Sequence, residues 1–528
     1  MKRGLYYVLI CLVGLTAFSC NKQLEITPVD QIPDARFWST ERDLDGSVAG
    51  AYALLRKTLS ESPRVSNAAD LNGYHPRHYM YGDRRGLIFA SVAQDPLRST
   101  LDADLKQNRI RTVIGGTRQW DEILFNWASF YQIVEQCNLV IENAHRVADN
   151  QFITYTREMY VAEARFIRAF TYFYMVRVWG DVPLNTKSRT TEKLARTDMN
   201  TVLDFVETEL KTAEADLLKD YAQSGRNAIR ATKGTVHATL AHVLAWRHKD
   251  AEAVSYATKV IDGGVYRLLT VSPGSTADKV NYMNIWKGKS AEGIFEIEFD
   301  AASGEYGTNG SLANLTLFGG VYASRKEPLW GISYIKKNVA IDGTVSWVKT
   351  RVDDPRVFFP DTTKDLRYTT NFDKAINFNP GNTFVFRKYG FAVDPVQNLF
   401  EANIVIFRVA DIMLLRAECN ARLLNYGPAR ADLDAIRNRA GLEAWTGTDA
   451  DLYLEIFRER TRELLGEGHY FYDLVRTGYI TEQDPEIVST KPDMTQADFD
   501  EGAWTWPVSN RAFTDNPNIQ QLRYWQRY

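Results

Sequence analysis

The sequence predicts a mainly α protein: a single large helical domain interrupted by one loop-rich insert that contains short β-strands. Apolar residues recur at helical spacing up to about residue 265 and again after about residue 405. Between about 266 and 405, Gly and Asn are frequent and short β-rich runs such as residues 293–299 appear. The 528 residues are 45% hydrophobic and 24% charged, which excludes a disordered chain, a collagen and a polytopic membrane protein.

The first 19 residues read as an export signal. Lys2 and Arg3 precede an apolar stretch over residues 5–18, which is too short for a permanent bilayer anchor. Residues 15–20 resemble a bacterial lipobox, although Ala17 stands where Leu is usual. We therefore expect a signal peptide over 1–19, a lipidated, palmitate-bearing Cys20 and an extended leader over 20–33. The alternative is an ordinary secretory signal with an incidental cysteine.

Helices are expected in order along the body. The first three cover residues 41–55, 121–144 and 157–179, and the last of these is apolar on several sides, as in a buried central helix. Arg165 and Arg168 on that helix need acceptors inside the scaffold, and Gly180 should end it. The pairs 235–246 with 250–262 and 410–424 with 429–440 carry small residues at helical spacing and resemble tetratricopeptide-type hairpins.

Charge and cysteine content narrow the function classes. The 63 Lys+Arg and 66 Asp+Glu residues give a net charge of -3, which offers no footprint for nucleic acid. Cys137 and Cys419 are isolated in amphipathic segments, so both are interpreted as small buried hydrophobes. The charged run over residues 459–463, followed by Glu467, is interpreted as a structural ion-pair network.

Motifs of catalysis are absent from the sequence. There is no GxGxxG after a strand, P-loop, GxSxG or HExxH, so neither a cofactor nor a metal is expected. His75 and His78 have a spacing that suits a metal, but nothing nearby completes the site, and a surface pair is favoured. A pair of carboxylates from distant positions would leave no motif, so a surface-anchored hydrolase stays as an alternative.

Several sequence blocks, in a fixed order, carry a family resemblance. The most specific is residues 163–184, with Glu163-Ala164-Arg165 near its start and Trp179-Gly180-Asp181-Val182-Pro183-Leu184 at its end. The others are residues 37–44, 131–138, 230–234, 407–418, 436–441, 467–476 and 506–508. Together they resemble the SusD/RagB family of outer-membrane nutrient-binding lipoproteins of Bacteroidetes, while the stretch from about 270 to 400 matches little.

The resemblance implies a function without catalysis. A member of this family is lipid-anchored at the outer membrane, faces the cell exterior and acts as the lid of a TonB-dependent, SusC-like transporter barrel. It captures oligosaccharides, or in some members oligopeptides, and delivers them to the barrel. Residues 34–528 would then form the α-helical ligand-binding domain, with the variable insert at about 266–405.

Two aromatic clusters are candidate ligand contacts, because aromatic faces stack on the apolar sides of sugars. The first lies in a Gly- and Pro-bearing segment and comprises Tyr74, His75, His78, Tyr79 and Tyr81. The second lies in the insert and comprises Trp330, Tyr334 and Trp347. The alternative is that these rings pack onto the scaffold or onto the barrel, and core packing is favoured for Trp120 and Trp127.

Overall fold

A computed structural model provides the structure of the chain. It describes residues 37–60, 76–91, 102–110, 124–222, 224–270, 276–300, 302, 330–332, 334–339, 345–350, 358–359, 361–374, 384–386, 388–389, 392–394, 399–482 and 491–528. The predicted signal peptide, Cys20 and the leader lie outside the described residues, as do Tyr74, His75 and Trp120.

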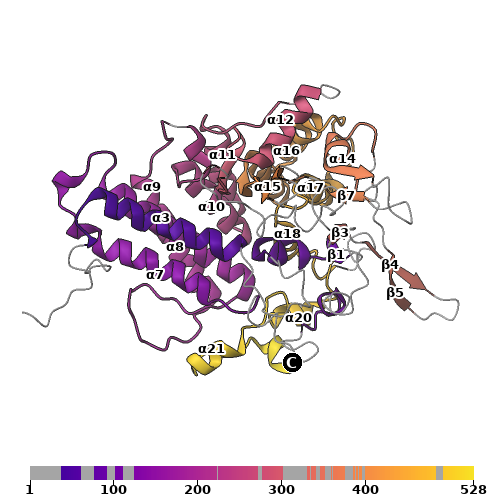
Figure 1. The fold of residues 1–528 in the computed structure, drawn as a ribbon. Coiled ribbons are helices and arrows are strands. Elements are labelled where there is room, and N and C mark those ends of the chain that lie inside the picture. Colours follow the sequence, from indigo (N-terminus) through magenta and orange to yellow (C-terminus); the bar gives the residue numbers. More distant parts are fainter. Residues whose placement is uncertain are drawn as a thin grey trace, which may run out of the picture.

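Four long helices form one half of the molecule, on the left of Figure 1. They are α3 (Glu41–Ser60), α7 (Ala128–Asn143), α8 (Arg157–Trp179) and α9 (Met199–Asp216). Helix α8 packs against α3, α7 and α9, and 19 of its 23 residues are buried. The predicted central helix is confirmed.

Both ends of α8 have the expected local chemistry. The Thr156 side chain accepts a hydrogen bond from the Met159 amide at the N-terminus, and Gly180, at φ +68°, ends the helix. Arg165 and Arg168 bind one carboxylate of α9: Arg165 Nη1 lies 2.6 Å from Glu209 Oε1, and Arg168 Nε lies 3.2 Å from Glu209 Oε2. The prediction that these arginines bind acceptors inside the scaffold is confirmed.

The two predicted hairpins are also present. Helices α10 (Lys233–Trp246) and α11 (Asp250–Ile261) form the first, and α15 (Val409–Arg422) and α16 (Tyr426–Arg439) form the second. Helix α11 packs against α15, so the hairpins are neighbours in space although the insert separates them in sequence. Helix α17 (Asp449–Glu463) packs on α15 and α16 and extends the same scaffold.

The described strands form five antiparallel pairs. These are β1 (Phe89–Ser91) with β3 (Trp330–Ile332), β2 (Gly293–Ile297) with β10 (Ile404–Arg408), β4 (Tyr334–Val339) with β5 (Val345–Thr350), β6 (Phe372–Lys374) with β7 (Phe384–Phe386), and β8 (Ala392–Asp394) with β9 (Leu399–Phe400). The β-rich run predicted at residues 293–299 is β2. Its pairing with β10 closes the insert at its base, directly before α15.

Short helices complete the described chain: α4 (Arg77–Tyr79), η2 (Met80–Arg84), η3 (Ala144–Arg146), η4 (Asp149–Gln151), η5 (Ser224–Ala228), α12 (Thr276–Lys287), α14 (Leu366–Asn371), α18 (Tyr470–Thr477), α20 (Gln496–Asp500), α21 (Asn510–Asp515) and η8 (Arg523–Arg527). Helix α12 lies in the insert, where the sequence predicted loops and short strands. It buries Tyr282, Ile285 and Trp286, one helical turn of apolar side chains that is too short to show as a periodic stripe.

The core is rich in aromatic rings. Trp179 makes edge contacts with Tyr81 and with Trp127, at ring-centroid distances of 5.8 and 5.9 Å. The expected core packing of Trp127 is confirmed, and Cys137 and Cys419 are buried free thiols. Among the helices of the described residues, none is both long enough and apolar enough to span a membrane.

Candidate ligand-binding face

Strands β3, β4, β5 and β7 of the insert lie with β1 at the end of the molecule opposite the long helices (Figure 1). We call this end the loop-bearing face and define it by these five strands. Strand β1 follows the first aromatic cluster along the chain, and β3 begins at Trp330. The register pairs Ser91 with Trp330 and Phe89 with Ile332. The pairing thus joins residues 89–91 to residues 330–332, which lie about 240 residues further along the chain.

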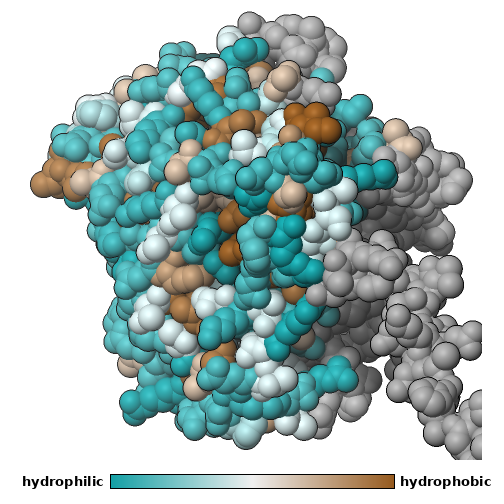
Figure 2. Space-filling view, turned by 90° about the vertical axis from the view of Figure 1, so that its left-hand side faces the viewer, coloured by the Kyte–Doolittle hydropathy of each residue, from teal (hydrophilic) through white to brown (hydrophobic). Residues whose placement is uncertain are grey.

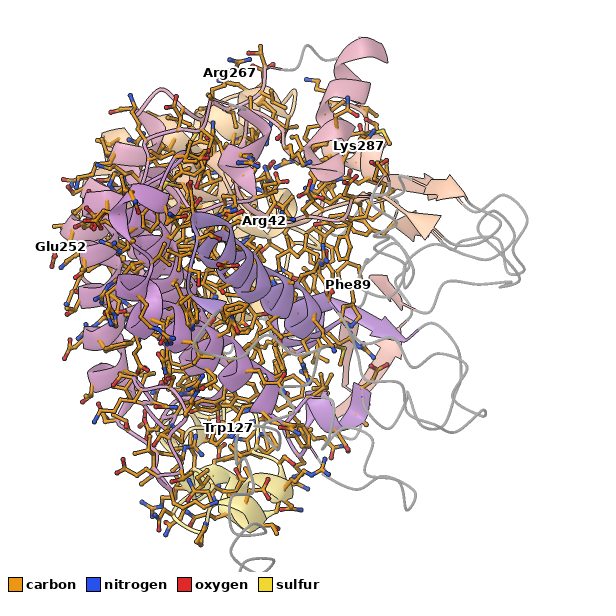
Figure 3. The ribbon with its side chains drawn as sticks, turned by 60° about the vertical axis from the view of Figure 1, so that its left-hand side comes forward. Arg42, Phe89, Trp127, Glu252, Arg267 and Lys287 are labelled. Carbon is orange, nitrogen blue, oxygen red and sulfur yellow. The ribbon has the colours of Figure 1, made fainter. Side chains whose placement is uncertain are left out.

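The face has a fixed aromatic base. The Phe89 ring lies 5.5 Å from that of Phe386 on β7, and Phe386 lies 5.3 Å from Phe372 on β6. Figure 3 shows Phe89 beside these strands, whereas Glu252 on α11 lies on the opposite side of the molecule. The base of the loop-bearing face is therefore part of the core.

The predicted contacts of the second cluster all fall on this face. Trp330 begins β3, while Tyr334 on β4 pairs with Thr350 and Trp347 on β5 pairs with Lys337. Their side chains lie outside what the structure describes, so they remain predicted ligand contacts. The same holds for Tyr74 and His75.

Three predicted contacts need correction. His78, Tyr79 and Tyr81 are 3%, 1% and 0% exposed, because α4 and η2 turn them into the core. The ring nitrogens of His78 lie 3.2 Å from Tyr174 Oη and 2.9 Å from the Glu467 carbonyl oxygen, and burial lowers the pKa of His78 to about 3. These three rings pack onto the scaffold, which was the stated alternative, and His78 is not half of a surface pair.

A close backbone contact explains this packing. Gly82 in η2 lies against Gly468, and a Cβ on Gly82 would stand 1.9 Å from the Gly468 carbonyl oxygen. Gly468 itself has φ +79°, a conformation that favours glycine. Two glycines thus let η2 and the segment before α18 touch, and that contact leaves His78 and its neighbours inside.

A buried ion-pair network lies under the loop-bearing face. The Arg408 guanidinium binds Glu463 Oε1 and Glu467 Oε1, each at 2.7 Å, and Glu292 Oε2 at 3.2 Å. All four side chains are fully buried. Burial alone would raise the pKa of Glu463, but the guanidinium groups of Arg439 and Arg408 outweigh it and hold the pKa well below its usual range.

Lys388 ties the insert to this network. Its ammonium group donates to the carbonyl oxygens of Leu465 and Glu463 at 2.9 and 3.2 Å and to Glu467 Oε1 at 2.5 Å. Burial lowers the pKa of Lys388 to about 8, against the pull of Glu467. The residue lies two positions after β7, so it holds the end of that strand against the turn that follows α17.

Asp83 joins the same region from η2. Its Oδ2 accepts a hydrogen bond of 2.8 Å from the Gly468 amide, and burial raises its pKa to about 7. A second network lies deeper, where Arg460 Nη2 binds Asp411 Oδ1 at 2.9 Å and Asp473 Oδ1 at 3.1 Å. The expected structural ion pairs over residues 459–467 are confirmed, and most of them connect different elements instead of neighbouring helical turns.

The buried ion pairs hold segments of the chain in place, and their charged side chains bind one another. Glu463 and Glu467 are both buried and bound to cations. Within the described residues, no group of three or more His, Cys, Asp or Glu side chains could hold a metal ion.

Sequence reasoning missed the supporting residues. Lys388 and Asp83 were not selected, because a single charged residue beside aromatic residues gives no periodic or motif signal. The blocks around Arg408 and Glu467 were noted, but their pairing across 59 residues cannot be read from spacing.

The protein is thus of the mainly α class: a scaffold of helical hairpins that carries an irregular face supported by buried ion pairs. The profile described as the SusD family matches residues 373–525, and one described as starch-binding associating with outer membrane matches residues 98–244. A SusD-like protein of Formosa agariphila is 28% identical over 95% of both chains. The chain belongs to the SusD/RagB family.

Solved structures show the same fold. A SusD homologue of Bacteroides thetaiotaomicron is 25% identical, with a TM-score of 0.75 over 93% of this chain and 99% of that one. A second SusD superfamily protein of that organism is 27% identical, with a TM-score of 0.70 over 92% and 99% of the two chains. A laminarin-binding SusD-like protein shares the fold at 18% identity, with a TM-score of 0.66 over 92% and 99%.

Proposed function

We propose that this protein captures oligosaccharides at the cell surface and delivers them to a TonB-dependent outer-membrane transporter, for which it acts as the lid. The observation that carries the proposal is the loop-bearing face, where β1 pairs with β3, the strand that begins at Trp330, above a fixed aromatic base. Loops on a rigid scaffold are the usual place for binding surfaces. Membership of a family with starch-binding and laminarin-binding relatives supports a glycan as the ligand.

In this proposal the chain is a lipoprotein. The signal peptide over 1–19 is removed, Cys20 is acylated, and residues 20–33 connect the lipid to the domain over 34–528. The insert at about 266–405 supplies the ligand contacts Trp330, Tyr334 and Trp347, and the segment before α4 supplies Tyr74 and His75. The lid hinges open to admit the glycan and closes over the SusC-like barrel to deliver it.

The test is calorimetry of the mature chain, residues 21–528, against a panel of oligosaccharides and mixed oligopeptides, with product analysis of every hit. Binding of one glycan class without turnover is expected. Replacing Trp330 or Trp347 by Ala should then weaken binding at least about fivefold, since a stacked aromatic ring contributes on the order of 1 kcal/mol or more. Ala substitution of Ile153, which is exposed on the helical side, is the control.

Other outcomes decide between alternatives. Binding of peptides alone would assign the same lid role to oligopeptide uptake. Cleavage of any bound ligand would replace the transport proposal by a surface hydrolase. Co-purification with the barrel after cross-linking in outer membranes tests the partner, and the absence of a barrel in the cross-linked product would contradict the lid role.

A further inference from the structure

One fully buried guanidinium group has no carboxylate partner. Arg85, directly after η2, is 0% exposed, and no carboxylate of the described residues forms an ion pair with it. Burial lowers the pKa of Arg85 to about 9, so its side chain is still charged at neutral pH. The structure describes four other arginines that are buried as completely, and each of them binds a carboxylate: Arg84, Arg367, Arg408 and Arg460.

Arg85 uses one of its three nitrogens for hydrogen bonds. Its Nη2 donates to Asn108 Oδ1 and, at 3.1 Å, to the carbonyl oxygen of Ala503. Its Nε and Nη1 are enclosed, and neither has an acceptor in the described part of the chain. Because Nε carries one hydrogen and Nη1 carries two, three of the five N–H donors of the guanidinium are left without an acceptor.

The groups around Arg85 supply further donors. The Ala503 carbonyl accepts a second hydrogen bond from Asn108 Nδ2 at 3.2 Å, and the Asn108 carbonyl accepts one from Tyr524 Oη at 2.7 Å. The ring centre of Trp506 lies 5.5 Å from the guanidinium carbon, and the indole N–H of Trp506 is enclosed without an acceptor among the described residues. What these surroundings need is an acceptor.

The aromatic contacts of Arg85 do not replace a counter-ion. Its guanidinium carbon lies 5.0 Å from the ring centre of Phe471 on α18, in addition to the contact with Trp506. Such contacts are favourable, but they are weaker than the desolvation cost of an unpaired buried ion. A water molecule could accept from Nη1, but it would not neutralise the charge, and its own hydrogens would need acceptors.

We propose that Arg85 binds a small monovalent anion of the halide class inside the fold. A halide beside Nη1 accepts hydrogen bonds, donates none and neutralises the guanidinium. The complete burial of Arg85 favours a single-atom ion over a larger anion such as phosphate. The site lies where η2 meets residue 108 and residues 503–506, so the bound ion would stabilise the contact between these three segments. The proposal does not rest on glycan uptake.

The first test is a crystal structure of the mature chain grown in sodium bromide, with diffraction data collected at the bromine absorption edge. An anomalous peak beside Arg85 Nη1 is expected. A water molecule at this position would give density without an anomalous signal. That result, or bromide found only at other places, would overturn the proposal.

The second test is thermal unfolding as sodium chloride replaces sodium methanesulfonate at constant ionic strength, which keeps general screening the same. The unfolding midpoint should rise with chloride and then level off, because an ion that binds only the folded state stabilises it. In Arg85→Met the midpoint should not depend on chloride. The matched control is Arg430→Met, which removes a partly exposed ion pair with Asp449 and should keep the dependence of the wild type.

Two outcomes of the second test count against the site. A wild-type midpoint that does not change with chloride, or a chloride dependence that persists in Arg85→Met, overturns the proposal. If Arg85→Met does not fold, the bromide position in the wild-type crystal decides. Neither test uses a glycan, so failure here leaves the proposed uptake at the loop-bearing face untouched.

Discussion

Arg408 is the centre of a buried ion-pair network, and its contribution to stability can be compared with that of an ion pair at the surface. It is fully buried and binds three carboxylates, whereas Arg430 binds Asp449 at 2.7 Å with both side chains partly exposed. Replacing Arg408 by Met leaves these three buried carboxylates with one cationic partner fewer and should lower the free energy of unfolding by about 3–5 kcal/mol. Arg430→Met should lower it by less than about 1 kcal/mol. Urea unfolding followed by circular dichroism compares the two, and equal losses would contradict a stabilising role of the network.

Asp83 predicts a pH dependence with a defined sign. Its pKa is raised from 3.8 to about 7 by burial, so between these values the folded protein binds a proton that the unfolded chain has lost. Its contribution to stability therefore falls as the pH rises from about 4 to 7, by up to about 4 kcal/mol. The Asp83→Asn variant keeps an acceptor for the Gly468 amide and removes the titration.

The measurement is the difference in unfolding free energy between Asp83→Asn and the wild type at pH 4, 5, 6 and 7. Burial lowers the pKa of His78 to about 3, which favours the folded state as the pH rises, so the total stability mixes both effects. Taking the difference isolates Asp83. The unfolding free energy of the variant should rise relative to that of the wild type as the pH increases. A difference that stays constant with pH would show that Asp83 ionises normally.

At the scale of elements, substitution of two glycines by alanine should change the stability of the protein in opposite directions. Gly82→Ala places a Cβ 1.9 Å from the Gly468 carbonyl and should force η2 away from the turn before α18, with a loss of at least about 2 kcal/mol. Gly46→Ala in α3 meets nothing within 4 Å and should stabilise the protein by about 0.5–1 kcal/mol, because Ala favours the helix. Thermal unfolding midpoints that move together would refute the close-contact argument.

The helical elements were predictable because each carries its own signal. Residues 157–179 are apolar on several sides and end at a glycine, and the predicted boundaries are those of α8. The prediction that His78 and Tyr79 are ligand contacts was wrong, because the local sequence does not distinguish a loop from a buried turn. Amphipathic rings beside Gly and Pro occur in both. What buries them is a contact with Gly468, about 390 residues away, and no local pattern reports it.

In the loop-bearing face too, residues with a local sequence signal could be selected, whereas residues that depend on tertiary contacts could not. Residues in β3, β4 and β5 were selected from their aromatic character, and the structure brings β3 to β1. Lys388 and the pairing of Arg408 with Glu467 depend on which segments meet in the fold. The residues that support the face could not be predicted from the sequence, and Trp330, Tyr334 and Trp347 remain predicted contacts.

At the scale of the whole molecule, the helical scaffold and the loop-bearing face lie at opposite ends. Buried charged side chains connect the two. The helical side is mostly hydrophilic with small scattered hydrophobic patches (Figure 2), and isolated apolar residues on a surface are ordinary. Arg408 at the end of β10, Lys388 after β7 and Asp83 in η2 converge around residues 463–468. One turn of the scaffold thus positions three segments that lead to the face.

The anchor gives the last prediction. If Cys20 carries the lipid, Cys20→Ser should move the protein from the detergent phase to the aqueous phase of a Triton X-114 partition and abolish incorporation of labelled palmitate. Two acyl-chain signals are needed for stable membrane anchoring, and removal of the acylated residue takes away both. Cys11→Ser, inside the predicted signal peptide, is the matched control and should leave partition and labelling unchanged. Palmitate incorporation that survives Cys20→Ser would refute the lipobox assignment, because the other two cysteines, Cys137 and Cys419, are buried in the core.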